Sequence, residues 1–177
     1  MEEKEPLQLI LVVETSKEEK SDTIYINDVL KKFFDLSDIN VQWEYLGGKT
    51  NYNNKKIENK IKNLTKMFKS NVSGKTTTIY FIDTDSTETE YKRGSFFYNL
   101  QEYVKERGYE LVWFCKNIEN VFLHKDPNYI DNKTEAAMQF VYDNRIDSID
   151  KNALSKVAIE LNCSNILVVL SKHIPNK

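Results

Sequence analysis

Short apolar runs alternate with helical patterns along the first two thirds of this sequence. Four runs rich in β-branched and aromatic residues predict strands at residues 7–13, 41–46, 76–82 and 109–115. Between them, apolar residues recur at helical spacing within residues 22–34, 53–70 and 95–107. Parallel strands need a crossover connection, usually a helix, so this alternation is typical of a parallel sheet covered on both faces. We therefore predict an α/β fold with a mostly parallel sheet and helices on both faces.

The last third of the chain has a different character. Residues 133–144 and 151–161 have helical patterns, and residues 164–174 suit either a strand or a helix capped by Ser164, of which we favour the helix. A chain of 177 residues is the size of one domain. We expect residues 1–125 to form the core and residues 126–177 to form a helical C-terminal extension packed on it.

Composition excludes several classes of protein. The net charge of −2, from 25 basic and 27 acidic residues, excludes nucleic-acid binding through overall charge. Two cysteines do not make a disulfide framework. No apolar run reaches the roughly 20 residues of a membrane span, and the acidic start lacks the basic residues of a signal peptide. We expect a cytoplasmic protein that has no membrane partner.

Acidic residues follow the predicted strands. Glu14 follows the first strand, Asp83 and Asp85 follow the third, and Glu119 comes after the fourth. The carboxyl ends of parallel strands share one edge of a sheet, and on an extended chain residues i and i+2 point the same way. Clustered carboxylates repel unless a cation neutralises them, and hard oxygen ligands suit Mg²⁺ or Mn²⁺. An aspartate after a strand is also an ordinary turn or capping residue, so each one alone has a structural interpretation.

The order of these motifs resembles the Toprim superfamily of topoisomerases, bacterial primases and overcoming-lysogenization-defect nucleases. A strand ending in Glu14, a helix, a strand, a helix and a strand ending in Asp83-Thr84-Asp85 reproduce its pattern. Thr15 replaces the usual glycine, and residues 16–19 read as an insertion before Ser21-Asp22. Residues 115–124 are similar to a segment of small RloB-like proteins encoded near restriction and abortive-infection systems.

The resemblance implies a Toprim-like core in residues 1–125 that cleaves DNA or RNA in bacterial phage defence, with Mg²⁺ or Mn²⁺ as cofactor. It implies Glu14 as general acid or base and Asp83 and Asp85 as a metal-binding pair, these three forming the catalytic set. The full implied metal set is Glu14, Asp22, Asp83, Asp85 and Glu119. A partner ATPase or another defence protein, and a homodimer, are left open.

Basic residues concentrate in the middle of the chain. Residues 49–75 contain eight lysines and one glutamate. Such a stripe beside an acidic metal site is typical of a phosphate-backbone binder, although a solvated helix face gives the same pattern. The candidate nucleic-acid contacts are Lys49, Lys55, Lys56, Lys60 and Lys62.

Two other functions fit the same sequence. The first is a Toprim-like module that binds nucleic acid or a partner protein without cleaving, which the substitution of Thr15 for glycine favours. The second is a signalling domain resembling response-regulator receivers, for which Lys116 after the fourth strand is the one hint.

Overall fold

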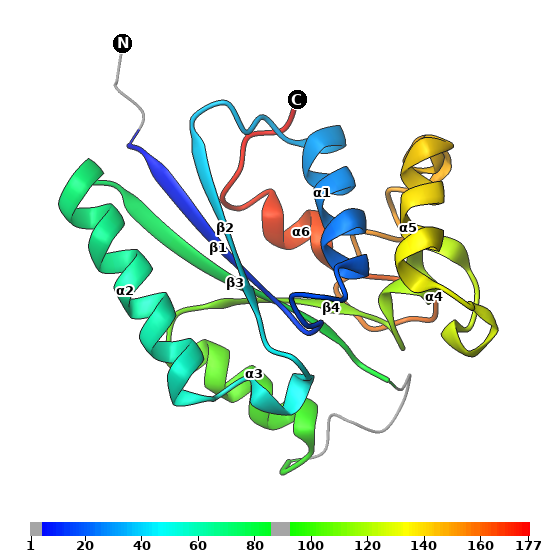
Figure 1. Cartoon of the computed structure of the whole chain (residues 1–177), viewed down its shortest axis with the longest axis horizontal. Coiled ribbons are helices and arrows are strands. Elements are labelled where there is room, and N and C mark those ends of the chain that lie inside the picture. The colour runs from blue at the N-terminus through cyan, green and yellow to red at the C-terminus, as the bar shows by residue number, and fades with distance from the viewer. Residues whose placement is uncertain (1–4, 86–92) are drawn as a thin grey trace.

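A four-stranded parallel sheet with helices on both faces forms the centre of the protein (Figure 1). The computed structural model describes residues 5–85 and 93–177. The strands are β1 (Leu7–Val13), β2 (Ile39–Tyr45), β3 (Lys75–Asp83) and β4 (Glu110–Phe114). They lie in the order β2-β1-β3-β4, and every pair is parallel. The predicted α/β class and the parallel sheet are confirmed.

The sheet has a point at which its strand order reverses. β1 lies at the centre, with Val13 opposite Tyr45 of β2 on one side and Phe81 of β3 on the other. The chain leaves β1 toward β2 at one edge and leaves β3 toward β4 at the other, which opens a crevice beyond the carboxyl ends of β1 and β3. Glu14 and Asp83 stand at this crevice.

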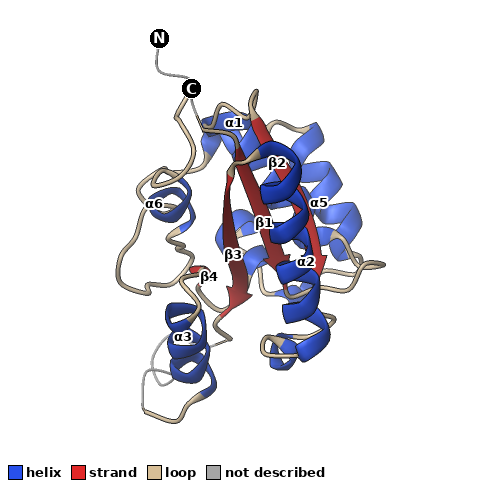
Figure 2. Cartoon of the chain, turned by 90° about the vertical axis from the view of Figure 1, so that its left-hand side faces the viewer, coloured by secondary structure: helices blue, strands red, loops and turns tan. Residues whose placement is uncertain are grey.

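Helices cover the two faces of the sheet in separate groups. One face carries α1 (Ser21–Phe33), α4 (Ile118–Leu123), α5 (Lys133–Tyr142) and α6 (Ile166–Leu170). The other carries α2 (Lys55–Val72) and α3 (Phe96–Glu106). Figure 2 shows α2 in front of the sheet and α1 and α5 behind it. Short 3₁₀ helices span Lys49–Asn51, Pro127–Tyr129 and Arg145–Ser148. Among the described residues, no helix is long and apolar enough to cross a membrane.

Alternating side chains of the strands fill two cores. Leu9, Leu11 and Val13 pack toward α1, whereas Ile10 and Val12 pack toward α2 and α3, and all five are fully buried. Burial on both faces explains why β1 is a continuous apolar run rather than an alternating one.

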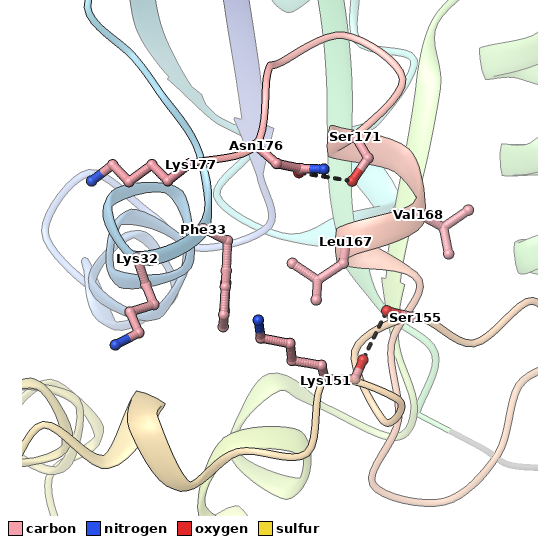
Figure 3. Close-up of a pocket in the computed structure, with 9 residues that line it drawn as sticks. All are labelled: Lys32, Phe33, Lys151, Ser155, Leu167, Val168, Ser171, Asn176 and Lys177. Carbon is pink, nitrogen blue, oxygen red and sulfur yellow. Dashed lines mark hydrogen bonds between the residues drawn. The ribbon is translucent and has the colours of Figure 1, made fainter.

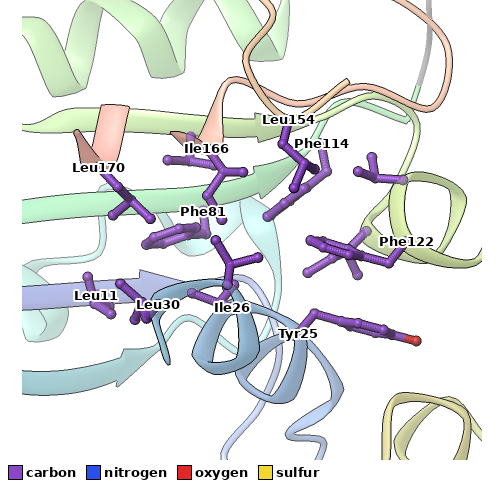
Figure 4. Close-up of a cluster of buried hydrophobic side chains, with 14 of the residues drawn as sticks. Leu11, Tyr25, Ile26, Leu30, Phe81, Phe114, Phe122, Leu154, Ile166 and Leu170 are labelled. Carbon is purple, nitrogen blue, oxygen red and sulfur yellow. The ribbon is translucent and has the colours of Figure 1, made fainter. Parts of the chain in front are cut away.

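The C-terminal residues belong to the same core as the sheet. Leu154, Ile166 and Leu170 join the cluster around Phe81 and Phe114, as Figure 4 shows. Helices α5 and α6 therefore cover one face of the sheet, while Cys163 joins the core on the other face.

The two helix predictions for residues 151–161 and 164–174 have different outcomes. Residues 151–161 form turns, because the amide of Lys156 donates to the Ser164 carbonyl while the amide of Ser164 donates to Ala153. The preference for a helix over a strand in residues 164–174 is confirmed by α6, but the helix spans only Ile166–Leu170 and its N-cap position is Asn165 rather than the predicted Ser164.

Candidate functional site

A hollow of about 420 Å³ lies at the crevice beyond β1 and β3. We call it the carboxylate pocket. Its lining residues are Glu14, Thr15, Ser16, Glu19, Asp22, Gly47, Gly48, Asp83, Glu119 and Lys133. Four of the five residues in the implied metal set, Glu14, Asp22, Asp83 and Glu119, therefore share one pocket.

The two strand ends are joined directly at the pocket. Glu14 follows the last residue of β1, and Asp83 is the last residue of β3. The amide of Asp83 donates a hydrogen bond to Glu14 Oε2 at 3.2 Å. This contact holds the Glu14 carboxylate beside the end of the neighbouring strand.

Two helices supply the buried acids. Asp22 lies in the first turn of α1 and accepts a hydrogen bond from Ser21 Oγ at 3.3 Å. Glu119 lies in the first turn of α4, which begins where the Asn117 side chain accepts from the Asn120 amide at 2.8 Å. The positive end of a helix dipole favours a carboxylate at both positions.

Burial and mutual repulsion disfavour ionisation of this cluster. Burial, together with the charges of Glu119 and Glu14, raises the pKa of Asp22 to about 7. The pKa of Asp83 is raised well above its ordinary value by burial and by the charges of Asp22, Glu14 and Glu119. Burial also raises the pKa of Glu14, although the hydrogen bond from Asp83 and the charge of Lys49 oppose this. A bound cation would reverse these shifts, since it favours the ionised carboxylates.

Lys133 lines the pocket but was not among the residues predicted from the sequence. Its Nζ lies 3.4 Å from Glu119 Oε1, and its charge lowers the pKa values of Glu14, Asp22 and Asp83. The signal was present in the helix periodicity, because Lys133 shares a face of α5 with the buried Ala137 and Phe140.

The donor set suits a hard divalent cation. Carboxylate oxygens are the ligands that such cations prefer, and the buried Glu119 Oε2 has no hydrogen-bond partner among the described residues. The side chains are not yet gathered around one point: within residues 5–85 and 93–177, no three His, Cys, Asp or Glu residues are arranged to hold a metal ion. The ammonium group of Lys133 supplies positive charge at Glu119 instead.

Asp85 does not join the pocket. Its φ of 60° departs from the extended backbone on which the shared direction of Asp83 and Asp85 was expected. The chain turns there because the amide of Asp85 donates to the Lys116 carbonyl at 2.8 Å. The side chain of Asp85 is 57% exposed and forms an ion pair with Lys49. The expectation that both carboxylates reach one space is therefore wrong for this geometry.

The lysines of α2 do not line the carboxylate pocket. Lys55, Lys56 and Lys62 are exposed on α2, which covers the face opposite α1, α4 and α5. Lys60 pairs with Glu44 of β2 at 2.8 Å. Lys49, next to the pocket residue Gly48, pairs with Asp85 and lies 5.0 Å from the centre of the Phe96 ring.

A second hollow, of about 530 Å³, lies between the end of α1 and α6 (Figure 3). Its lysines have structural partners: Lys32 pairs with Asp147, Lys177 donates to the Lys31 carbonyl, and Lys151 Nζ lies 5.1 Å from the centre of the Phe33 ring. Cations at this position complement the negative end of the α1 dipole. These contacts explain the positions of the three lysines without requiring a bound ligand.

Neither a protein-family model nor a curated protein matches this chain. The relationship to the Toprim superfamily therefore stays a prediction from its motifs.

Proposed function

We propose that this protein is a Mg²⁺- or Mn²⁺-dependent nuclease that cleaves phosphodiester bonds of DNA or RNA at the carboxylate pocket. The observation that carries this function is the meeting of four carboxyl groups from β1, α1, β3 and α4 at the strand-order reversal. Buried acids with raised pKa values in one pocket are typical of a functional site.

The pocket residues would take different roles. Asp22, Asp83 and Glu119 are the ligands we assign to the cation, because they come from three separate elements and Glu119 has a free buried oxygen. When bound, the metal would lower the pKa of water and neutralise charge on the cleaved phosphate. Glu14 is half-buried, and burial raises its pKa, which suits a carboxyl group that takes and returns a proton.

Nucleic-acid contacts would extend from the pocket onto a second face. Lys49 lies near Glu14, and Lys55, Lys56 and Lys62 have exposed side chains on α2. Lysines that contact phosphates release counterions, so binding through them weakens steeply as salt rises. A role in cytoplasmic phage defence beside a partner ATPase or another defence protein rests on the RloB-like resemblance alone.

Cleavage assays on single- and double-stranded DNA and RNA test this function. We expect cleavage with Mg²⁺ or Mn²⁺ and none with EDTA. Glu14→Gln should lower the rate at least about a hundredfold, because proton transfer by a positioned side chain contributes on that order. The matched control is Glu18→Gln, which changes an exposed carboxylate four residues away and should cleave at the wild-type rate. Equal rates for Glu14→Gln and Glu18→Gln would contradict the proposal.

A module that binds nucleic acid without cleaving it is the second candidate. The ion pair between Lys133 and Glu119 favours it, because the pocket already contains a cation of its own. This candidate predicts a band shift that EDTA does not change, with the substrate intact.

A receiver-like signalling domain is the third candidate, and it is favoured by the strand order. The order β2-β1-β3-β4 is shared with the first four strands of receiver-type sheets, and Asp83 ends the third. Phosphorylation of Asp83 by acetyl phosphate, detected by mass spectrometry, would support it.

A further inference from the structure

Lys133 occupies a position that its own helix disfavours. It is the first residue of α5, where the helix dipole is positive and a carboxylate would be preferred. The helix already has an N-cap, since the Asn132 side chain accepts from the Glu135 amide at 3.0 Å. A lysine at this position is repelled by the positive end of the helix dipole and does not stabilise the helix. Departures of this kind concentrate at functional sites.

The packing of α5 directs Lys133 at the carboxylate pocket. Phe140 makes edge contacts with Tyr25 of α1 and Phe122 of α4, at ring-centre distances of 5.3 and 5.6 Å. Lys133 precedes Phe140 by seven residues and so lies on the same inward face. The helices that anchor α5 are the ones that carry Asp22 and Glu119. The position of Lys133 relative to these acids is therefore set by an aromatic core.

The two partners of the ion pair differ in their freedom to move. The side chain of Glu119 is 1% exposed, whereas that of Lys133 is 50% exposed. Lys133 can swing into solvent on its flexible stem, but Glu119 has no such exit. Among the described residues that line the pocket, Lys133 is the one cation, and the lining contains five acidic residues: Glu14, Glu19, Asp22, Asp83 and Glu119. Its departure would leave the buried Glu119 without its ion-pair partner.

We propose that Lys133 is a built-in counter-cation that stabilises the metal-free pocket and that a divalent cation must displace. The ion pair between Lys133 and Glu119 and the binding of a divalent cation then exclude each other. This inference rests on the proposed function only in taking the carboxylate pocket as the metal site. It explains why the four acids converge without being arranged as ligands around one point.

Calorimetric titration with Mn²⁺ tests the exclusion. Lys133→Met should bind Mn²⁺ at least about tenfold more tightly than wild type, because the cation no longer competes with an ammonium group. Lys133→Arg retains the charge, and Lys125→Met removes an exposed lysine outside the pocket; both should bind as wild type does. Equal affinity of Lys133→Met and wild type would overturn the inference, as would Mn²⁺ binding by none of the proteins.

A measurement on the wild-type chain covers the case in which Lys133→Met does not fold. Acetylation of Lys133 by an amine-reactive ester, quantified by mass spectrometry against Lys125, should rise at least about threefold on saturation with Mn²⁺, as the ion pair opens. Binding of Mn²⁺ with no change in this ratio would overturn the inference.

The outcomes separate this inference from the nuclease proposal. Tighter Mn²⁺ binding by Lys133→Met without any cleavage by wild type supports the counter-cation and contradicts the nuclease. Metal-dependent cleavage with unchanged Mn²⁺ affinity in Lys133→Met supports the nuclease and overturns the counter-cation.

Discussion

Replacing Asp22 with asparagine should stabilise the metal-free protein, and the gain should grow with pH. In the folded protein the pKa of Asp22 is raised from 3.8 to about 7, chiefly by burial. Between these two values the unfolded chain loses the proton while the folded protein keeps it. The free energy of unfolding therefore falls as pH rises through this window and reaches its lowest level above pH 7. The substitution would remove this dependence because an asparagine amide does not ionise.

The magnitude follows from the two pKa values. A tenfold change in proton affinity corresponds to about 1.4 kcal/mol, so the difference between 3.8 and about 7 corresponds to about 4 kcal/mol. At pH 5 only about 1.5 kcal/mol of this penalty has developed, and at pH 8 all of it has. The missing attraction between the charged Asp22 and the α1 dipole opposes the gain by about 0.3–1 kcal/mol.

Urea denaturation followed by circular dichroism measures this gain. Wild type, Asp22→Asn and the control Asp38→Asn, which alters an exposed carboxyl on the loop before β2, are compared at pH 5 and pH 8 in EDTA. The advantage of Asp22→Asn over wild type should widen by about 2–3 kcal/mol between these pH values, while Asp38→Asn follows wild type. A constant difference between Asp22→Asn and wild type from pH 5 to pH 8 would refute the reasoning.

Three other substitutions test the packing and the basic face. Phe140→Ala should lower the free energy of unfolding by about 3–5 kcal/mol and the melting temperature by about 10 °C, because Phe140 is 1% exposed. The control Tyr142→Ala, at an exposed position, should lower the free energy of unfolding by less than about 0.5 kcal/mol. Equal melting temperatures for the two variants would contradict the packing of Phe140 in the core. Gly74→Ala should destabilise by about 1–3 kcal/mol, since its Cβ would lie 2.3 Å from the Pro6 carbonyl oxygen; an unchanged urea midpoint contradicts that close approach. Joint replacement of Lys55, Lys56 and Lys62 by glutamate should weaken DNA or RNA binding and make the affinity less sensitive to salt, because fewer phosphates are neutralised. Fluorescence anisotropy measures this affinity, and an unchanged value would rule out a role for these lysines.

Local pattern was sufficient to predict the sheet, because β1, β3 and β4 are buried over most of their length and β2 is partly buried, so each strand is rich in apolar residues. The run at residues 76–82 lies within β3, and the run at residues 7–13 is β1. Pattern failed at residues 151–161, where the hydrogen bonds to Ser164 replace helical ones and Val157 is left exposed. Such long-range backbone pairing has no signal within an eleven-residue window.

The part of the candidate site that lies at the ends of the strands was predictable from the sequence. Glu14 and Asp83 meet because parallel strands place their carboxyl ends together, and the first-turn acids Asp22 and Glu119 complete the pocket. Asp85 was wrongly grouped with them because a single positive φ turns its side chain toward Lys49. Lys133 could not be found from the motif order, since it reaches the pocket through the packing of α5 on α1 and α4.

Anomalous diffraction from crystals soaked in Mn²⁺ tests the central claim most directly. The account predicts an anomalous peak within the carboxylate pocket, among Glu14, Asp22, Asp83 and Glu119, with the Lys133 side chain displaced from Glu119. Data from crystals soaked in saturating Mn²⁺ that contain no peak in this pocket, or a peak at Asp85 alone, would contradict it.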